Sequence, residues 1–210
     1  MIHHFDLGSV LRRSVSDLYT NLVTRSTGAA VRAEIEHELA AQPLGAGRLL
    51  AIIDVTHVGL LDYSCADEVV AKLLLRYALP GAPHDAYFVL RGAQEAHVDA
   101  IEAALARYGL ALVAEGVGPA GDARLLGAVP DDERRVWDAA YRLGTADVGR
   151  VAAYLAIEGE LAVNLDGIAR TLVALSGRRL VICVGADAAA GERYVAVGRA
   201  ECMLDIMTQH

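Results

Sequence analysis

The strongest constraint on the fold is an unbroken aliphatic run, Arg48–Val55 (RLLAIIDV), which follows the turn-rich segment QPLGAG. A continuous apolar run of this kind predicts a strand that is buried on both faces of a sheet. Two shorter runs, Ala86–Leu90 (AYFVL) and Leu110–Ala114 (LALVA), predict further strands. Helical periodicity precedes and separates these runs, at Gly28–Ala41, Cys65–Tyr77 and Gln94–Tyr108. The alternation predicts an α/β domain with right-handed crossovers and a mostly parallel, or mixed, sheet.

The two ends of this domain are less well marked. Residues 1–27 form either an N-terminal extension or the first strands. The first 23 of them are ambiguous: they contain one or two short strands, or a helix from about Val10 to Leu22. After Ala114 the chain becomes rich in Gly and Pro (EGVGPAGDARLLGAVPDDE), which indicates a boundary. We therefore expect a first domain at 1–115 and a linker at 116–130.

A second, smaller α+β domain is expected at 131–200, followed by a tail at 201–210. Its helices are predicted at Asp132–Leu143, at Ala146–Leu155 with Thr145 as N-cap, and at Asn164–Leu175. Two short strands, Arg179–Val184 and Tyr194–Val197, follow. Three short helices and a hairpin in this order resemble a winged helix-turn-helix.

Composition limits the function classes. The chain has 210 residues, 54% of apolar type and 22% charged, which is typical of a folded globular protein. Its formal net charge of −8 gives no long-range attraction to nucleic acid or to an anionic membrane. The absence of a signal-peptide pattern and of a long uncharged apolar stretch predicts a cytoplasmic protein without a membrane partner. Three widely spaced cysteines imply no disulfide framework.

The most informative motif follows the first aliphatic run, where the chain reads THVGLLDYSCADEVVAKLLL. A buried strand ends, a short loop follows, and Asp62-Tyr63-Ser64 leads directly into a helix. Ser64 and Asp67 fit a capping box, with Ser64 as the N-cap and Asp67 at the third helical position. Asp67 and Glu68 would also complement the positive end of the helix dipole.

This pattern resembles the STAS domain of bacterial anti-sigma factor antagonists, in which an aliphatic strand runs into an Asp-Ser-Ser-Gly turn before a helix. Asp62 takes the Asp position, Tyr63 the first Ser, Ser64 the phosphorylatable Ser and Cys65 the Gly. The run Ser64–Glu68 (SCADE) is also similar to a STAS-like variant with a Ser-Phe-Ala-Asp-Glu signature. The resemblance covers roughly residues 28–115.

The resemblance implies a regulatory function. Ser64 would be a phosphorylation site, and Asp62, Tyr63, Ser64 and Asp67 would bind a regulatory protein such as an anti-sigma factor or a kinase. A phosphoserine adds about −1.5 to −2 charge, which the helix N-terminus would favour and the neighbouring carboxylates would oppose. Ser64 as an ordinary N-cap is the alternative. Whether the protein forms a homo-oligomer stays open.

A second polar cluster, Thr24-Arg25-Ser26-Thr27, precedes the first clear helix. Hydroxyl groups and an arginine at a helix start can bind an anion. In a parallel sheet this loop and the Ser64 turn would share the carboxyl edge, where ligands of α/β proteins bind. The alternative is a Thr or Ser cap beside a solvated arginine.

The C-terminal domain leaves DNA binding as the alternative function, a transcriptional regulator with a STAS-like sensory domain. Its DNA-contacting residues would be Asn164, Arg170, Thr171 and Arg193. Residues 131–210, however, carry nine Arg against twelve acidic residues, and DNA binding usually needs a clustered basic face. We therefore favour protein contacts for this domain.

Enzymatic chemistry has little support. The sequence has no Gly-rich phosphate loop, no nucleophile elbow and no metal-ligand spacing, so we expect no catalytic residues, no metal and no cofactor. Cys65, at a helix start, is either a redox-sensing thiol or a small buried residue, and the second interpretation is favoured.

Overall fold

The computed structural model describes residues 1–15, 21–41, 48–78, 82, 85–116, 122–158, 164–187 and 191–199. The chain forms two compact units, Met1–Ala128 and Val129–His210, which are described separately. The expected linker at 116–130 is wrong in part, because it contains a strand, β5 (Arg124–Gly127), that belongs to the first unit. The expected tail at 201–210 lies outside the described residues.

The first unit contains a five-stranded sheet with the strand order β1-β2-β3-β4-β5. Strands β1 to β4 are parallel, and β5 runs antiparallel to β4. This confirms the expected α/β class with a mixed, mostly parallel sheet. Besides β5, the strands are β1 (Ile2–Asp6), β2 (Arg48–Asp54), β3 (Asp85–Arg91) and β4 (Ala111–Glu115).

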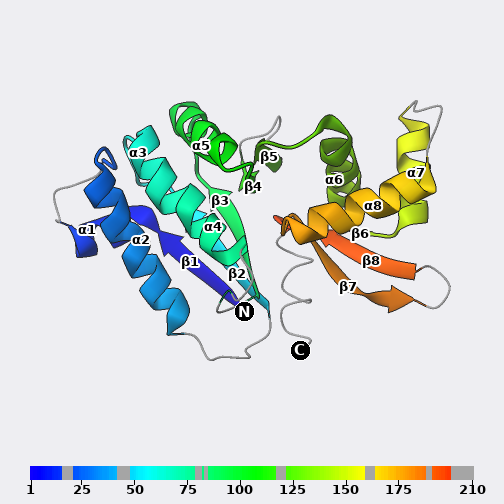
Figure 1. Cartoon of the computed structure of the whole chain (residues 1–210), viewed down its shortest axis with the longest axis horizontal. Coiled ribbons are helices and arrows are strands. Elements are labelled where there is room, and N and C mark those ends of the chain that lie inside the picture. The colour runs from blue at the N-terminus through cyan, green and yellow to red at the C-terminus, as the bar shows by residue number, and fades with distance from the viewer. Residues whose placement is uncertain are drawn as a thin grey trace. The chain divides into compact units, whose positions relative to one another are not determined.

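Helices connect the parallel strands and pack on one face of this sheet (Figure 1). In chain order they are α1 (Leu7–Ser14), α2 (Arg25–Ala40), α3 (Tyr63–Ala66), the π-helical turn η1 (Asp67–Ala71), α4 (Lys72–Ala78) and α5 (Glu95–Arg107). On β2, Ala51 and Ile53 face the helices, while Leu50 and Ile52 face the other way and are also buried. The prediction of a strand buried on both faces is therefore confirmed.

The first residues resolve the open alternatives. They form one strand, β1, followed at once by α1, whose N-cap Asp6 accepts a hydrogen bond from the Gly8 amide at 3.0 Å. The interpretation of a short strand is confirmed, whereas the helix expected from Val10 to Leu22 is wrong in its bounds: α1 begins at Leu7, where Asp6 caps it, and ends at Ser14, and Leu22 lies in a β-bridge. Helix α2 also begins earlier than expected, at Arg25, because Thr24 accepts from the Thr27 amide.

The second unit contains a three-stranded antiparallel sheet of order β6-β8-β7. Its elements are α6 (Asp131–Leu143), β6 (Thr145–Ala146), α7 (Val148–Ile157), α8 (Leu165–Gly177), β7 (Val181–Asp187) and β8 (Gly191–Ala196). Buried Trp137 anchors α6 by donating from Nε1 to the Leu180 carbonyl at 3.0 Å. The expected Thr145 cap is wrong, since Thr145 pairs in β6 and Asp147 caps α7.

Within the described parts of both units, no helix has the length and apolarity that crossing a membrane requires.

Candidate functional site

The motif residues form the N-terminal turn of one continuous helix, Tyr63–Ala78, which comprises α3, η1 and α4 and is here called the motif helix. Its N-cap is Asp62, whose Oδ1 accepts from the Cys65 amide at 2.8 Å. Ser64 lies inside the first turn, and its hydroxyl donates to the Asp62 carboxylate at 2.9 Å. The predicted capping box of Ser64 and Asp67 is therefore wrong, because the helix begins earlier and a stronger acceptor caps it.

A second segment lies beside this turn. A parallel bridge joins Leu22 to Leu61: the Leu22 amide donates to the Leu60 carbonyl at 2.8 Å, and the Asp62 amide donates to the Leu22 carbonyl at 2.9 Å. Leu22 and Leu61 point inward and are buried, so the alternate side chains Val23 and Leu60 point to solvent. We call Val23, Leu60, Tyr63 and Ser64 the Ser64 surface; its three larger side chains are exposed apolar groups.

The polar segment Thr24–Thr27 and the Ser64 turn, both expected at the carboxyl edge of the sheet, are in contact in the structure. The Cys65 thiol donates to the Thr24 carbonyl at 2.9 Å, so the start of α2 contacts the start of the motif helix. The Thr24 hydroxyl lies within hydrogen-bond distance of the hydroxyls of Ser26 and Thr27, at 3.0 and 2.8 Å. Arg25, the expected anion ligand, is instead bound to the protein's own carboxylates.

Those carboxylates belong to Asp67 and Glu68, which begin the π-helical turn and are both buried. A π-helical turn within an α-helix is rare and is frequent at functional sites. Asp67 was predicted to contact a partner directly. That prediction is wrong, because its side chain is 0% exposed.

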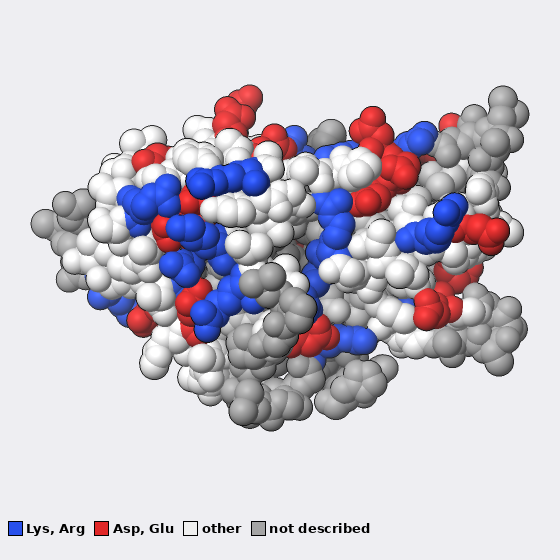
Figure 2. Space-filling view, in the orientation of Figure 1, with Lys and Arg blue, Asp and Glu red and all other residues white. Residues whose placement is uncertain are grey.

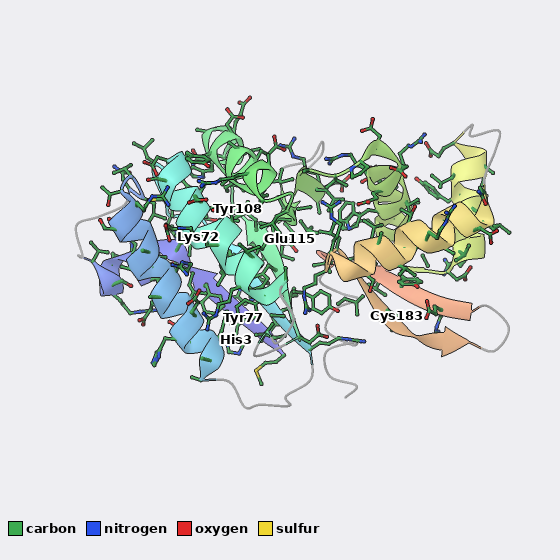
Figure 3. All side chains as sticks on the ribbon, in the orientation of Figure 1. His3, Lys72, Tyr77, Tyr108, Glu115 and Cys183 are labelled. Carbon is green, nitrogen blue, oxygen red and sulfur yellow. The ribbon has the colours of Figure 1, made fainter. Side chains whose placement is uncertain are left out.

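Cations from three helices surround the buried carboxylates. Arg25 donates from Nη1 to Asp67 at 2.7 Å and to Glu68 at 2.8 Å. Lys72 donates to Glu68 at 2.5 Å, and Arg32 donates to the other Glu68 oxygen at 3.2 Å. Arg107 approaches Asp67 to 4.0 Å from α5. Lys72 lies on the motif helix, facing the end of α5 (Figure 3).

The cations keep both carboxylates ionised. Burial acts to raise the pKa of Asp67, but the hydrogen bond from Arg25 and the nearby charges of Lys72 and Arg25 outweigh it, so the pKa lies below its ordinary value of 3.8. Burial likewise opposes ionisation of Glu68, and hydrogen bonds from Lys72 and Arg25 lower its pKa below 4.5. The pair therefore carries two negative charges near neutral pH, balanced within the unit.

A glycine permits the close approach of α2 to the motif helix. A Cβ atom on Gly28 would lie 3.0 Å from Cys65 Cα and 3.1 Å from Glu68 Cβ. Any larger residue would separate the helices that carry Arg25 and Glu68. At the same contact, burial and the nearby Asp62 carboxylate raise the pKa of Cys65 to about 11. The thiol is buried and protonated near neutral pH, which confirms the interpretation as a small buried residue.

The candidate DNA-contacting residues of the second unit lie on its surface, and two of the four, Arg170 and Arg193, are basic. Asn164 is the N-cap of α8 and accepts from the amides of Asp166 and Gly167. Arg170 donates from Nε to the Asp166 carbonyl at 3.3 Å. Thr171 is partly buried in α8, and Arg193 is exposed on β8.

Sequence reasoning missed most of the cations that hold Asp67 and Glu68. The sequence did contain a signal for two of these cations, Lys72 and Arg32. Glu68 and Lys72 are four residues apart on a helix, as are Arg32 and Glu36, and this spacing favours ion pairs. No sequence signal pointed to Arg107, which reaches the site from a different helix.

Among the described residues, no group of three or more His, Cys, Asp or Glu side chains is placed to hold a metal ion. Comparisons with protein-family models, with curated proteins and with solved structures each found no match. The fold and the site therefore define only a class, an α/β unit with a surface motif followed by a small α+β unit.

Proposed function

We propose that this chain is a non-enzymatic regulatory protein of the anti-sigma factor antagonist type, which acts through protein–protein contacts at the Ser64 surface. The observation that supports this most is that exposed apolar side chains and a hydroxyl group occur together on the Ser64 surface. Three exposed apolar side chains, Val23, Leu60 and Tyr63, lie on the bridge and turn that carry the Ser64 hydroxyl. Apolar groups gathered on a surface commonly mark an interaction site, and the STAS resemblance centres on the same residues.

A phosphoswitch at Ser64 fits this arrangement. The hydroxyl is partly exposed and is bound to Asp62, so a phosphoryl group would break that bond and face a partly exposed carboxylate. Asp67 and Glu68 are close to Ser64 in sequence and would repel the added charge. Their ion pairs with Arg25 and Lys72 weaken this repulsion. Phosphorylation would therefore alter the surface that a partner meets more than the helix beneath it.

For the second unit we propose a winged-helix-like module that also contacts protein. The order α6-β6-α7-α8-β7-β8 and the three-stranded sheet support that comparison. Its helix α8 exposes Leu165 and Val173 beside a single cation, Arg170. An apolar surface with one positive charge suits a protein partner better than a phosphate backbone. Sequence-specific DNA binding is the second candidate function, on the strength of the element order.

The test is capture of a partner by the full chain, with identification by mass spectrometry, followed by matched substitutions. Leu60→Ser changes the Ser64 surface, and Ile157→Ser is its control, since Ile157 is an exposed apolar residue of the second unit that belongs to neither proposed contact surface. We expect Leu60→Ser to weaken binding of the identified partner by about tenfold and Ile157→Ser to leave it unchanged. Binding that depends on Ile157 alone, or on neither residue, would contradict the proposed surface.

The switch is tested with the same partner. Ser64→Glu should weaken binding more than Ser64→Ala, because only the first introduces charge at the surface. Equal binding by both variants and the unchanged protein would exclude a phosphoswitch. Retention of one preferred duplex DNA sequence at low salt, without a protein partner, would favour the second candidate function.

A further inference from the structure

We propose that the helical face beside the Ser64 surface binds an acidic segment of the partner protein. This inference rests on the proposed function and adds the chemistry of the partner. The cations of this face are here called the cationic surface: Arg25, Arg32, Lys72, Arg76 and Arg107. Figure 2 shows Lys and Arg side chains gathered over the helices of the first unit.

The cationic surface is continuous, because each cation contacts a carboxylate that the next one also contacts. Asp67 lies 2.7 Å from Arg25, 3.8 Å from Lys72 and 4.0 Å from Arg107. Glu68 extends the contacts from Arg25 and Lys72 to Arg32. The remaining link is Glu36, which lies 3.1 Å from Arg32 and 3.8 Å from Arg76.

The acidic side chains of this group are more deeply buried than the basic ones. The side chains of Asp67, Glu68 and Glu36 are 0%, 5% and 18% exposed, whereas those of the five cations are 27% to 56% exposed. The carboxylates therefore lie beneath the cations, and the cations are what an approaching partner meets. Five positive charges above three negative ones leave a net positive surface.

The surroundings have the opposite sign. Residues 1–128 contain ten basic and fifteen acidic side chains, and five of the basic ones but only three of the acidic ones belong to the cationic surface. The rest of the unit is strongly acidic. A long polyanion such as a nucleic acid would extend past the surface into this negative field, whereas a short acidic peptide segment would not. The compact charge distribution therefore favours a protein ligand.

Arg107 connects the cationic surface to the Ser64 surface. It donates to the Tyr63 hydroxyl at 3.4 Å, and Tyr63 is one of the exposed side chains beside Ser64. A partner segment that seats an apolar side chain near Leu60 and Tyr63 would bring its neighbouring carboxylates to Arg107, Arg25 and Lys72. The expected ligand is thus a segment that combines acidic residues with an apolar one.

The experiment uses a blocked octapeptide of glutamate and leucine, and a matched peptide with glutamine in place of glutamate. Titration into ¹⁵N-labelled full-length protein should shift amide signals of α2, the motif helix and α5 for the acidic peptide only. Lys72 is the single lysine of the chain. Carbodiimide coupling should therefore attach the acidic peptide mainly at Lys72, and attachment only at the N-terminal amine would contradict the proposal.

Matched charge reversals give the decisive comparison. Arg107→Glu changes a peripheral cation of the surface, and Arg13→Glu is the control, because Arg13 pairs with Glu38 and is 56% exposed against 55% for Arg107. We expect Arg107→Glu to weaken peptide binding by about tenfold and Arg13→Glu to change it little. Equal effects of the two variants, or no binding of the acidic peptide, would overturn the inference. So would tighter binding of an oligothymidylate of the same charge.

Binding of the identified partner by Leu60→Ser and by Arg107→Glu distinguishes a failure of this inference from a failure of the proposed function on which it rests. An identified partner that is lost with Leu60→Ser but fully retained with Arg107→Glu would uphold the proposed function and overturn the acidic-ligand inference. A partner retained with both variants would overturn the proposed function. Loss with both variants, and retention with Arg13→Glu, is the result expected if both are correct.

Discussion

Two stretches at the start of the motif helix, the capped turn Asp62–Cys65 and the π-helical turn Asp67–Ala71, use the same residue chemistry in opposite ways. In the first, the Asp62 carboxylate is partly exposed and binds a backbone amide and the Ser64 hydroxyl. In the second, the carboxylate of Asp67 is fully buried and is bound by a cation from another helix. Proximity in sequence to a motif therefore does not identify the residues that a partner can reach.

The two stretches are expected to contribute differently, the buried carboxylates to stability and the exposed turn to partner binding. The buried carboxylates link α2, the motif helix and α5 through ion pairs, so changing them alters the unit as a whole. In the exposed turn, the hydrogen bonds that the side chains of Asp62 and Ser64 make with each other and with the Cys65 amide stay within the turn, so we expect a change of Ser64 to appear mainly in binding. Three stability measurements test this separation.

The largest effect is expected for Asp67→Asn. Removing the charge leaves Arg25 and Lys72 with one partner fewer in a buried network, which should lower the free energy of unfolding by about 3 kcal/mol. Glu38→Gln, which changes the half-exposed pair with Arg13, should cost no more than about 0.5 kcal/mol. Urea denaturation followed by circular dichroism measures both. Equal losses in the two variants would show that the buried network adds no more stability than a surface pair.

The second effect is a dependence on pH. Because the pKa values of Asp67 and Glu68 are lowered in the folded state, the unfolded chain binds more protons in acid. Their contribution is complete above their ordinary values of 3.8 and 4.5 and is lost as the pH falls through the lowered values. The free energy of unfolding should therefore decline below about pH 4.5. In Asp67→Asn the decline should be shallower, and an unchanged slope would contradict the role given to Asp67.

The smallest effects distinguish the two residues of the exposed turn. Asp62→Ala removes the N-cap and should cost about 1 kcal/mol. Ser64→Ala removes only a hydroxyl that donates to the cap, and should cost less than about 0.5 kcal/mol. Thermal unfolding of both variants tests the order. A larger loss for Ser64→Ala would restore Ser64 as the residue that holds the helix end.

Much of the first unit could be predicted because its signals are local. The run that forms β2 was placed to within one residue, and its burial on both faces followed from unbroken aliphatic character. Strand β5 was missed, because its four residues stand among Gly and Pro and gain their structure from pairing with β4. The early starts of α1 and α2 depended on caps, Asp6 and Thr24, that precede the apolar periodicity.

The candidate site was predictable only in part. The motif Asp62-Tyr63-Ser64 was found at the carboxyl edge from the order of elements. Asp67 was assigned to the partner-binding surface with Asp62, Tyr63 and Ser64, on the resemblance to STAS domains. The π-helical turn buries it, and that turn has no sequence signature of its own.

By itself the sequence determined the alternation of strands and helices, the position of the motif and the acidic balance of the chain, since these follow from residue type and spacing. The tertiary structure decided which charges are buried. Arg25 and Arg107 are 42 and 40 residues from Asp67 in the chain, and only the packing of their helices brings them to it. The physical reason is that burial and ion pairing depend on distances in space, and neighbours in sequence do not fix those distances.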